Sequence, residues 1–130
     1  KQAALAAVVD GKTLKAALYL ASATTGPTNA AYTATGELAA TGNYTAGGAS
    51  VTNGNSAGLT GTTAYWTPSA SISWSNLTSS GAFDAAMIYS TTDSNRNIGV
   101  FTFGSQSVTA GNFSLTMPTN DASTGLVRFA

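Results

Sequence analysis

The sequence predicts an all-β fold, an antiparallel β-sandwich or jelly roll of about seven or eight strands with an N-terminal arm. Three observations support this prediction. The chain has 130 residues, 43% of them hydrophobic, which suits one domain with its own core. Threonine, serine and glycine are abundant, whereas long helix-forming residues are scarce beyond residue 23. Several segments alternate between apolar and polar residues, which is the period of half-buried strands.

The N-terminal segment, residues 1–13, is expected to form an arm or a hairpin ahead of a single β-sandwich domain over residues 14–130. Residues 1–9 read KQAALAAVV, a run that fits a short helix, an edge strand or an arm reaching to a neighbouring subunit. The pair Asp10-Gly11 lies between two apolar runs and is a strong hairpin signal.

Alternation locates most strands of the domain. Residues 14–22 contain good helix formers, but their apolar residues also alternate, so a strand is favoured there. Further strands are expected at 32–38, 48–52, 61–67, 70–74, 85–90, 97–103, 113–117 and 125–130. Residues 85–90 and 97–103 are apolar on both faces, which is typical of central strands covered on both sides. The turn-forming residues between these two segments predict a hairpin loop.

The composition argues against several functional classes. Five basic and five acidic residues give no net charge and no basic stripe, so we expect no nucleic-acid partner. No apolar run approaches the roughly 20 residues of a membrane span, so we expect no membrane partner. Histidine and cysteine are absent, which removes the usual general base and common metal ligands. We therefore expect no catalytic residue, no cofactor and no metal. The scattered carboxylates are Asp10, Glu37, Asp84, Asp93 and Asp121.

Three motifs have a functional interpretation that is weaker than the structural one. Residues 6–13 resemble a phosphate-binding loop without its first glycine, and a plain turn explains them better. Residues 93–99 place oxygen-bearing side chains at alternate positions, as a calcium loop does, but they lack the closing glutamate and fit a hairpin tip. Tyr65, Trp66 and Trp74 could stack on a sugar, although aromatic residues on strands usually belong to a core.

Longer segments carry a resemblance to a known family. TATGELAATGNYTAGGASVT is followed by GTTAYWTPSASISWSNLTSSGAFDAAMIYSTT and then by NIGVFTFGSQSVTAGNFSLTMP. In this order they resemble a family of small virion proteins of tailed bacteriophages, over about residues 14–130. The matching elements are 35–38, 42–48, Trp74, 86–89 and 103–104, with Asn43 as an insertion before the tyrosine.

The resemblance implies a non-enzymatic capsid cement or decoration protein on the outer capsid surface. Such a protein binds the major capsid protein, stabilises contacts between its subunits, and binds itself, as a homotrimer or alternatively a dimer. The expected interface residues are Lys1, Gln2, Leu5, Val8, Glu37, Tyr44 and Trp66. Within the glycine-rich stretch 36–48, close backbone approach to a neighbouring surface is expected, with the aromatic ring of Tyr44 as anchor.

The alternative is a glycan- or receptor-binding module of a phage head or tail fibre. Exposed Tyr65 and Trp66 beside a polar groove would favour this alternative. A buried pair beside a flat apolar face formed by loops would favour the cement protein. A hydrolase would need two carboxylates facing one bond, and nothing in the sequence pairs them.

Overall fold

The structure, a computed structural model, describes residues 1–26 and 28–130 and shows a chain made mostly of antiparallel β-strands. The elements in chain order are α1 (Gln2–Val9), β1 (Leu14–Leu20), β2 (Ala49–Val51), β3 (Gly58–Thr60), β4 (Thr63–Trp66), β5 (Ile72–Leu77), β6 (Phe83–Ser90), β7 (Arg96–Gln106), β8 (Gly111–Leu115) and β9 (Val127–Phe129). The all-β prediction is therefore confirmed. The strands form three sheets, in the orders β2-β1-β6-β7, β3-β4-β9 and β5-β8.

The four-stranded sheet is the centre of the molecule. Strand β6 pairs with β1 on one side and with β7 on the other, and residues 85–90 are buried without exception, as their apolar sequence predicts. Strand β7 also had the sequence of a central strand, but it lies at the edge of the sheet and residues 97–101 are only half-buried. The prediction of a central strand at 97–103 is therefore wrong, because an apolar sequence does not determine how many strands pair with the segment.

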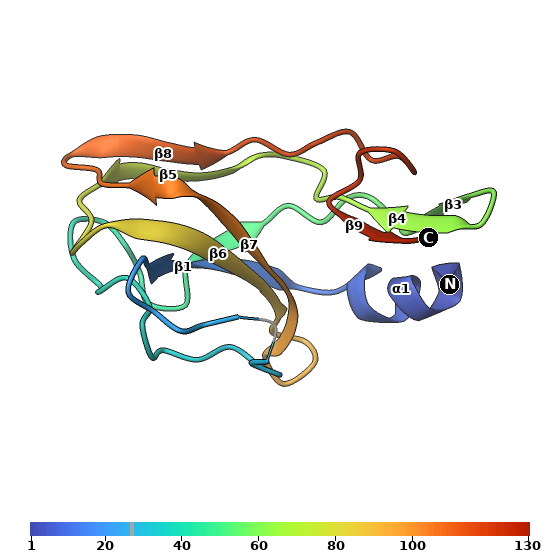
Figure 1. Cartoon of the computed structure of the whole chain (residues 1–130), viewed down its shortest axis with the longest axis horizontal. Helices are drawn as coiled ribbons and strands as arrows, with labels where there is room; N and C mark the ends of the chain where they lie inside the picture. The colour runs from blue at the N-terminus through green and yellow to red at the C-terminus, as the bar shows by residue number, and fades with distance from the viewer. Residues whose placement is uncertain (27) are drawn as a thin grey trace.

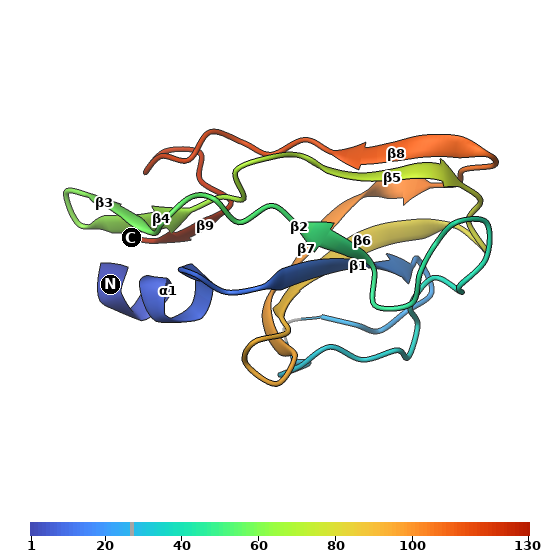
Figure 2. The ribbon, with the colours of Figure 1, turned by 180° about the vertical axis from the view of Figure 1, so that it is seen from behind.

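The two-stranded sheet, β5 and β8, covers one face of the four-stranded sheet (Figures 1 and 2). Ile72 and Trp74 of β5 are buried while Ser71 and Ser73 are exposed, so the predicted alternation is confirmed. Between the layers, aromatic rings meet edge to face: the centroids of Phe83 and an aromatic ring of β8, Phe113, lie 4.9 Å apart at 90°. This cluster supplies the large apolar contacts between the two layers.

The long connection between β1 and β2 covers the other face of the four-stranded sheet. It packs Tyr32 and Ala23 against a second group of buried side chains that includes Tyr19 and Met87. A strand was predicted over 32–38, but the described residues of the connection form only isolated bridges, between Tyr19 and Glu37 and between Ala31 and Arg96. Backbone bonds to β1 and to side chains hold this segment without a continuous ladder.

The helix and the three-stranded sheet form the end of the molecule where both termini lie (Figure 1). Of the three conformations expected for residues 1–9, the structure has the helix, and it packs against β4. Leu5 and Val9 of α1 are fully buried and belong to the same core as Trp66. Asp10-Gly11 does form a turn, with φ of 65° at Gly11, but it joins a helix to a strand and not two strands. Strand β3 was not predicted, because it lies in a stretch rich in glycine, serine and asparagine, a composition typical of loops.

Candidate functional site: the glycine-rich loop and the helical end

The glycine-rich stretch 36–48 continues the edge of β1 beyond its short pairing with β2. The backbone N–H of Leu38 donates to the carbonyl of Leu18 at 2.9 Å, and the N–H of Leu20 donates to the carbonyl of Gly36 at 2.9 Å. These two bonds replace a partner strand along the last residues of β1. Residues 36–38 are therefore hydrogen-bonded to the edge of the sheet, and this pairing fixes the orientation of their side chains.

The carboxylate of Glu37 is the centre of a polar cluster under this loop. Its Oε1 accepts hydrogen bonds from the hydroxyl of Tyr44 at 2.7 Å and from the backbone N–H of Gly47 at 2.7 Å. Its Oε2 accepts a hydrogen bond from the hydroxyl of Tyr32 at 2.6 Å. The Tyr44 hydroxyl in turn accepts the backbone N–H of Leu18 at 2.9 Å. Charge-assisted bonds of this kind are the strong ones, so Glu37 ties three parts of the chain together.

Two further tyrosines extend the cluster. The hydroxyl of Tyr89 donates to the carbonyl of Gly47 at 2.7 Å, and its ring stacks on Tyr32 with centroids 4.7 Å apart. The hydroxyl of Tyr19 donates to the carbonyl of Thr33 at 2.6 Å. Each phenol thus satisfies a backbone carbonyl that the irregular loop would otherwise leave without a partner.

All four phenols are harder to ionise than tyrosine in water. Burial raises the pKa of Tyr19 to about 12, and the negative charge of Glu37 acts in the same direction. Burial also raises the pKa of Tyr32, Tyr44 and Tyr89 above the usual value, with Glu37 again adding to the effect. Neutral phenols and an ionised carboxylate suit a structural cluster, because the phenols then donate and the carboxylate accepts.

The glycines of this loop serve contacts within the chain. Gly48 has φ of 80°, and a Cβ at this position would lie 1.8 Å from the carbonyl oxygen of Ala16. The close backbone approach expected for a neighbouring subunit is therefore made to β1. Tyr44 is 3% exposed and its hydroxyl is bonded to Glu37, so both side chains already have partners within the fold. Their place in an interface with another subunit stays a prediction.

The predicted interface residues of α1 divide between surface and core. Lys1 and Gln2 are exposed, but Lys1 Nζ donates to the carbonyl of Thr62 at 3.1 Å and Gln2 Nε2 to that of Ala57 at 2.9 Å. Leu5 is fully buried in the core of the chain itself, and its place in an interface stays a prediction. These contacts make α1 a docked element of the domain.

The remaining predicted interface residues also contact the chain itself. Val8 is half-buried against the core, and Trp66 is fully buried. The indole N–H of Trp66 lies within hydrogen-bond distance of Asn53 Oδ1, at 3.1 Å, and of the Asn55 carbonyl, at 3.2 Å. An indole in this position cannot stack on a sugar, so Tyr65 and Trp66 do not form the exposed pair that the glycan-binding alternative requires. The place of Trp66 in an interface stays a prediction.

Sequence reasoning missed the two large apolar side chains that are exposed. Leu59 of β3 is 48% exposed and Phe129 of β9 is 44% exposed. The register places both opposite Ala64 of β4, so they lie on the same face of the three-stranded sheet, on either side of the central strand. The alternation of Val127, Arg128 and Phe129 could have indicated the face, but exposure depends on what α1 leaves uncovered.

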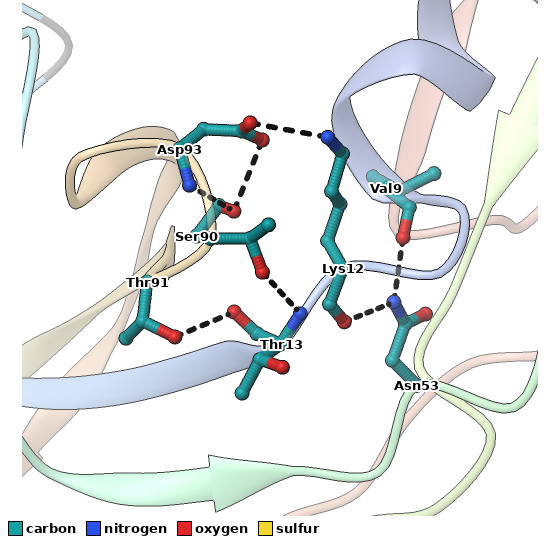
Figure 3. A network of polar contacts seen from close by, with 8 residues as sticks. Val9, Lys12, Thr13, Asn53, Ser90, Thr91 and Asp93 are labelled. Atoms are coloured by element: carbon teal, nitrogen blue, oxygen red, sulfur yellow. Dashed lines mark hydrogen bonds and ion pairs between the residues drawn. The ribbon is translucent and has the colours of Figure 1, made fainter.

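A polar clamp joins the start of β1 to the β6–β7 hairpin (Figure 3). Lys12 Nζ and Asp93 Oδ1 form an ion pair at 3.1 Å, and the hydroxyl of Ser90 donates to the other Asp93 oxygen at 3.1 Å. These hydrogen bonds, that from Lys12 first, hold the pKa of Asp93 below its usual value. The hydroxyl of Thr91 donates to the carbonyl of Thr13 at 3.1 Å. The clamp fixes the direction in which the chain leaves α1.

A second set of bonds fixes the C-terminal end of α1. Asn53 Nδ2 donates to the carbonyls of Val9 at 2.6 Å and Lys12 at 3.0 Å, as Figure 3 shows. Asp10 Oδ1 accepts the backbone N–H of Ala57 at 2.7 Å. The last carbonyls of a helix have no hydrogen-bond donor within the helix, and the side-chain amide of Asn53 supplies a donor to the carbonyl of Val9. Residues 6–13 are thus used in joining the helix to the sheets.

In the hairpin tip at 93–99, the residues that resemble a calcium loop make contacts or turns within the chain. Asn97 Nδ2 donates to the carbonyl of Asn29 at 2.8 Å, and Asn95 has φ of 60°, a turn conformation. Asp93 is bound by Lys12 and Ser90. Among residues 1–26 and 28–130, no group of three or more histidine, cysteine or acidic residues could hold a metal ion.

Across the described part of the chain, the helix is too short to cross a bilayer. Comparisons with protein-family models, with curated proteins and with solved structures found no match to this chain.

Proposed function

We propose that this chain is a non-enzymatic structural protein of a bacteriophage virion, a capsid cement protein that binds the outer capsid surface. The observation that carries the proposal is the lack of charge: charged residues are 8% of the chain, against about 25% in a typical soluble domain. An uncharged surface of threonine, serine, asparagine and alanine has little repulsion to prevent close association. The resemblance to small phage virion proteins supports the same assignment.

Four of the five acidic side chains have structural partners, which supports a role without catalysis. Glu37 binds two tyrosines, Asp10 binds a backbone amide, and Asp93 binds Lys12. Asp121 Oδ1 accepts the backbone N–H groups of Ser123 and Thr124, both at 2.7 Å, within its own turn. Carboxylates with such partners stabilise the conformation of loops, and a protein that functions only by binding other proteins needs loops of fixed conformation.

We propose the helical end as the face that meets the major capsid protein. It carries the exposed side chains of Leu59 and Phe129, and α1 beside it exposes Ala3, Ala4 and Ala7. Small and apolar groups permit close approach without charge to desolvate. Each contact is weak, but a homotrimer that docks at several points gains about 10²- to 10⁴-fold in avidity.

The experiment is to purify particles of the phage that encodes the chain and measure how many copies remain after washing. The double variant Leu59→Asp, Phe129→Asp should be retained much less than the wild type, because two buried charges would face the capsid. The matched control Ser71→Asp, on an exposed residue ahead of β5, should be retained normally.

Circular dichroism must show that both variants fold. Absence of the chain from washed wild-type particles would refute the virion role. Equal retention of all three proteins would refute the helical end as the docking face. The glycan-binding alternative has less support, because it requires an exposed Trp66 and this residue is fully buried.

A further inference from the structure

An apolar cavity opens between the two layers of the sandwich at the side where β7 lies. Its volume is about 160 Å³. Its walls come from β6, from β7, from the strand end at 115–117 and from the segment that leads into β9. The apolar side chains that line it include Ala86, Ile88, Phe101, Phe103, Leu115 and Met117. Apolar cavities of about this size hold one benzene-sized group.

Both strands beside the cavity are edge strands. β7 is the last strand of its sheet, and β8 pairs only with β5. The connection before β2 pairs with the first residues of β7, through the N–H of Asn97 and the carbonyl of Ala30 at 3.0 Å. Within the described chain, residues 98–106 have no partner strand on their outer side. Their outward N–H and C=O groups are therefore free to pair with an added strand, except the carbonyl of Gly104, which accepts the side-chain amide of Gln106 at 3.0 Å.

Over residues 99–102, where β7 keeps a continuous register with β6, the edge lacks the charge and the proline that usually prevent strand addition. Exposed edges in monomeric proteins commonly carry proline, or lysine and other charged residues. Between Arg96 and Asp121 this chain has no charged residue, and β7 contains no proline. The absence of charge at both walls of the cavity favours an uncharged occupant, because a charged one would lose its hydration without gaining a partner.

We propose that this cavity and the free edge of β7 together form a docking site for an extended, uncharged segment of another protein. The segment adds to β7 as a new strand and inserts one aromatic side chain between the layers. The free peptide groups select an extended backbone, and the cavity selects the side chain, which is the division of roles in β-strand addition. The site lies on the sandwich and does not depend on the proposed virion role.

The test uses a short capped peptide of alternating threonine and valine with one central phenylalanine, and its twin with a central alanine. Isothermal titration of the full chain should show about 10- to 100-fold tighter binding of the phenylalanine peptide, because only that peptide buries a ring. A third peptide, N-methylated on alternate amides, should not bind, because it cannot pair with the strand edge.

Two variants test the cavity itself. Ala86→Leu, which fills the cavity from its floor, should remove the preference for phenylalanine, whereas Ala70→Leu, the same change at an exposed site, should leave it intact. If Ala86→Leu does not fold, Met117→Lys, at a half-buried residue of the cavity wall, serves instead and should weaken binding of the phenylalanine peptide.

Three results would overturn the proposal. The first is equal affinity for the phenylalanine and alanine peptides, or no binding of either. The second is unchanged binding of the methylated peptide, which would mean capture of a ring without strand addition. The third is self-association of the free chain that the phenylalanine peptide reverses in sedimentation, because the occupant is then a second copy of this chain.

Discussion

At the scale of single residues, Glu37 and Tyr44 do most to order the irregular part of the chain. The Tyr44 hydroxyl both donates to Glu37 and accepts from the backbone of Leu18, so it links the loop to β1 with two bonds. Both bonds lie at a side chain that is 3% exposed, where water cannot replace a lost partner. Removing the hydroxyl therefore leaves a buried N–H and a carboxylate oxygen short of partners.

The variant Tyr44→Phe is expected to lower the free energy of unfolding by about 1–3 kcal/mol, the cost of leaving a buried polar group without its bond. Chemical denaturation followed by circular dichroism measures this change. The matched control is Tyr32→Phe, which also removes a phenol bonded to Glu37, but from a half-buried ring, and should cost less. Equal and negligible losses in both variants would show that the cluster does not hold the loop.

At the scale of elements, α1 is the part whose role most needed the structure. Apart from Gln2 its exposed residues are alanines, so its sequence shows no extended polar face, and a helix of eight residues is too short to be stable in isolation. Its stability comes from Leu5 and Val9, which enter the core beside β4, and from the bonds of Asn53 and Asp10 at its end. The helix is therefore part of the domain and not a free arm.

The variant Leu5→Ala tests that conclusion. It should lower the free energy of unfolding by about 2–5 kcal/mol, since a fully buried leucine leaves a cavity when truncated. The control Val8→Ala, at a half-buried position of the same helix, should cost clearly less. Thermal unfolding of the three proteins compares them directly, and a wild-type melting curve for Leu5→Ala would mean that α1 is not docked.

At the scale of the whole molecule, the raised pKa values of four tyrosines make the stability decrease at alkaline pH. In the folded chain their pKa values are raised, that of Tyr19 to about 12, whereas a tyrosine in the unfolded chain ionises near pH 10. Above about pH 10 the unfolded chain thus releases protons that the folded chain retains. Linkage then requires the unfolding free energy to fall as the pH rises.

We therefore expect full stability below about pH 10 and a progressive loss from about pH 10 to about pH 12. Urea unfolding at a series of pH values measures the slope. Glu37→Gln should make the slope shallower, because it removes the negative charge that helps to raise the pKa values. A stability that is constant across this range would contradict neutral, buried phenols.

The sequence alone was sufficient for the class of fold and for most strand positions. Alternation is a local property, so Ile72 and Trp74 could be assigned to the buried face and their serine neighbours to the exposed face. The expected strands at 14–22, 48–52, 61–67 and 85–90 all overlap observed strands. Composition also limited the available chemistry, because side chains that a chain lacks cannot appear on folding.

The directions of individual side chains and the neighbours of each strand required the tertiary structure. Tyr44 meets Leu18 across 26 residues of sequence, and the period of a segment carries no information about a partner so distant. For the same reason β7 could not be recognised as an edge, nor Trp66 as fully buried. Local pattern determines which face of a strand is apolar, whereas long-range pairing decides what covers that face, and on that pairing depends which surface is left to bind.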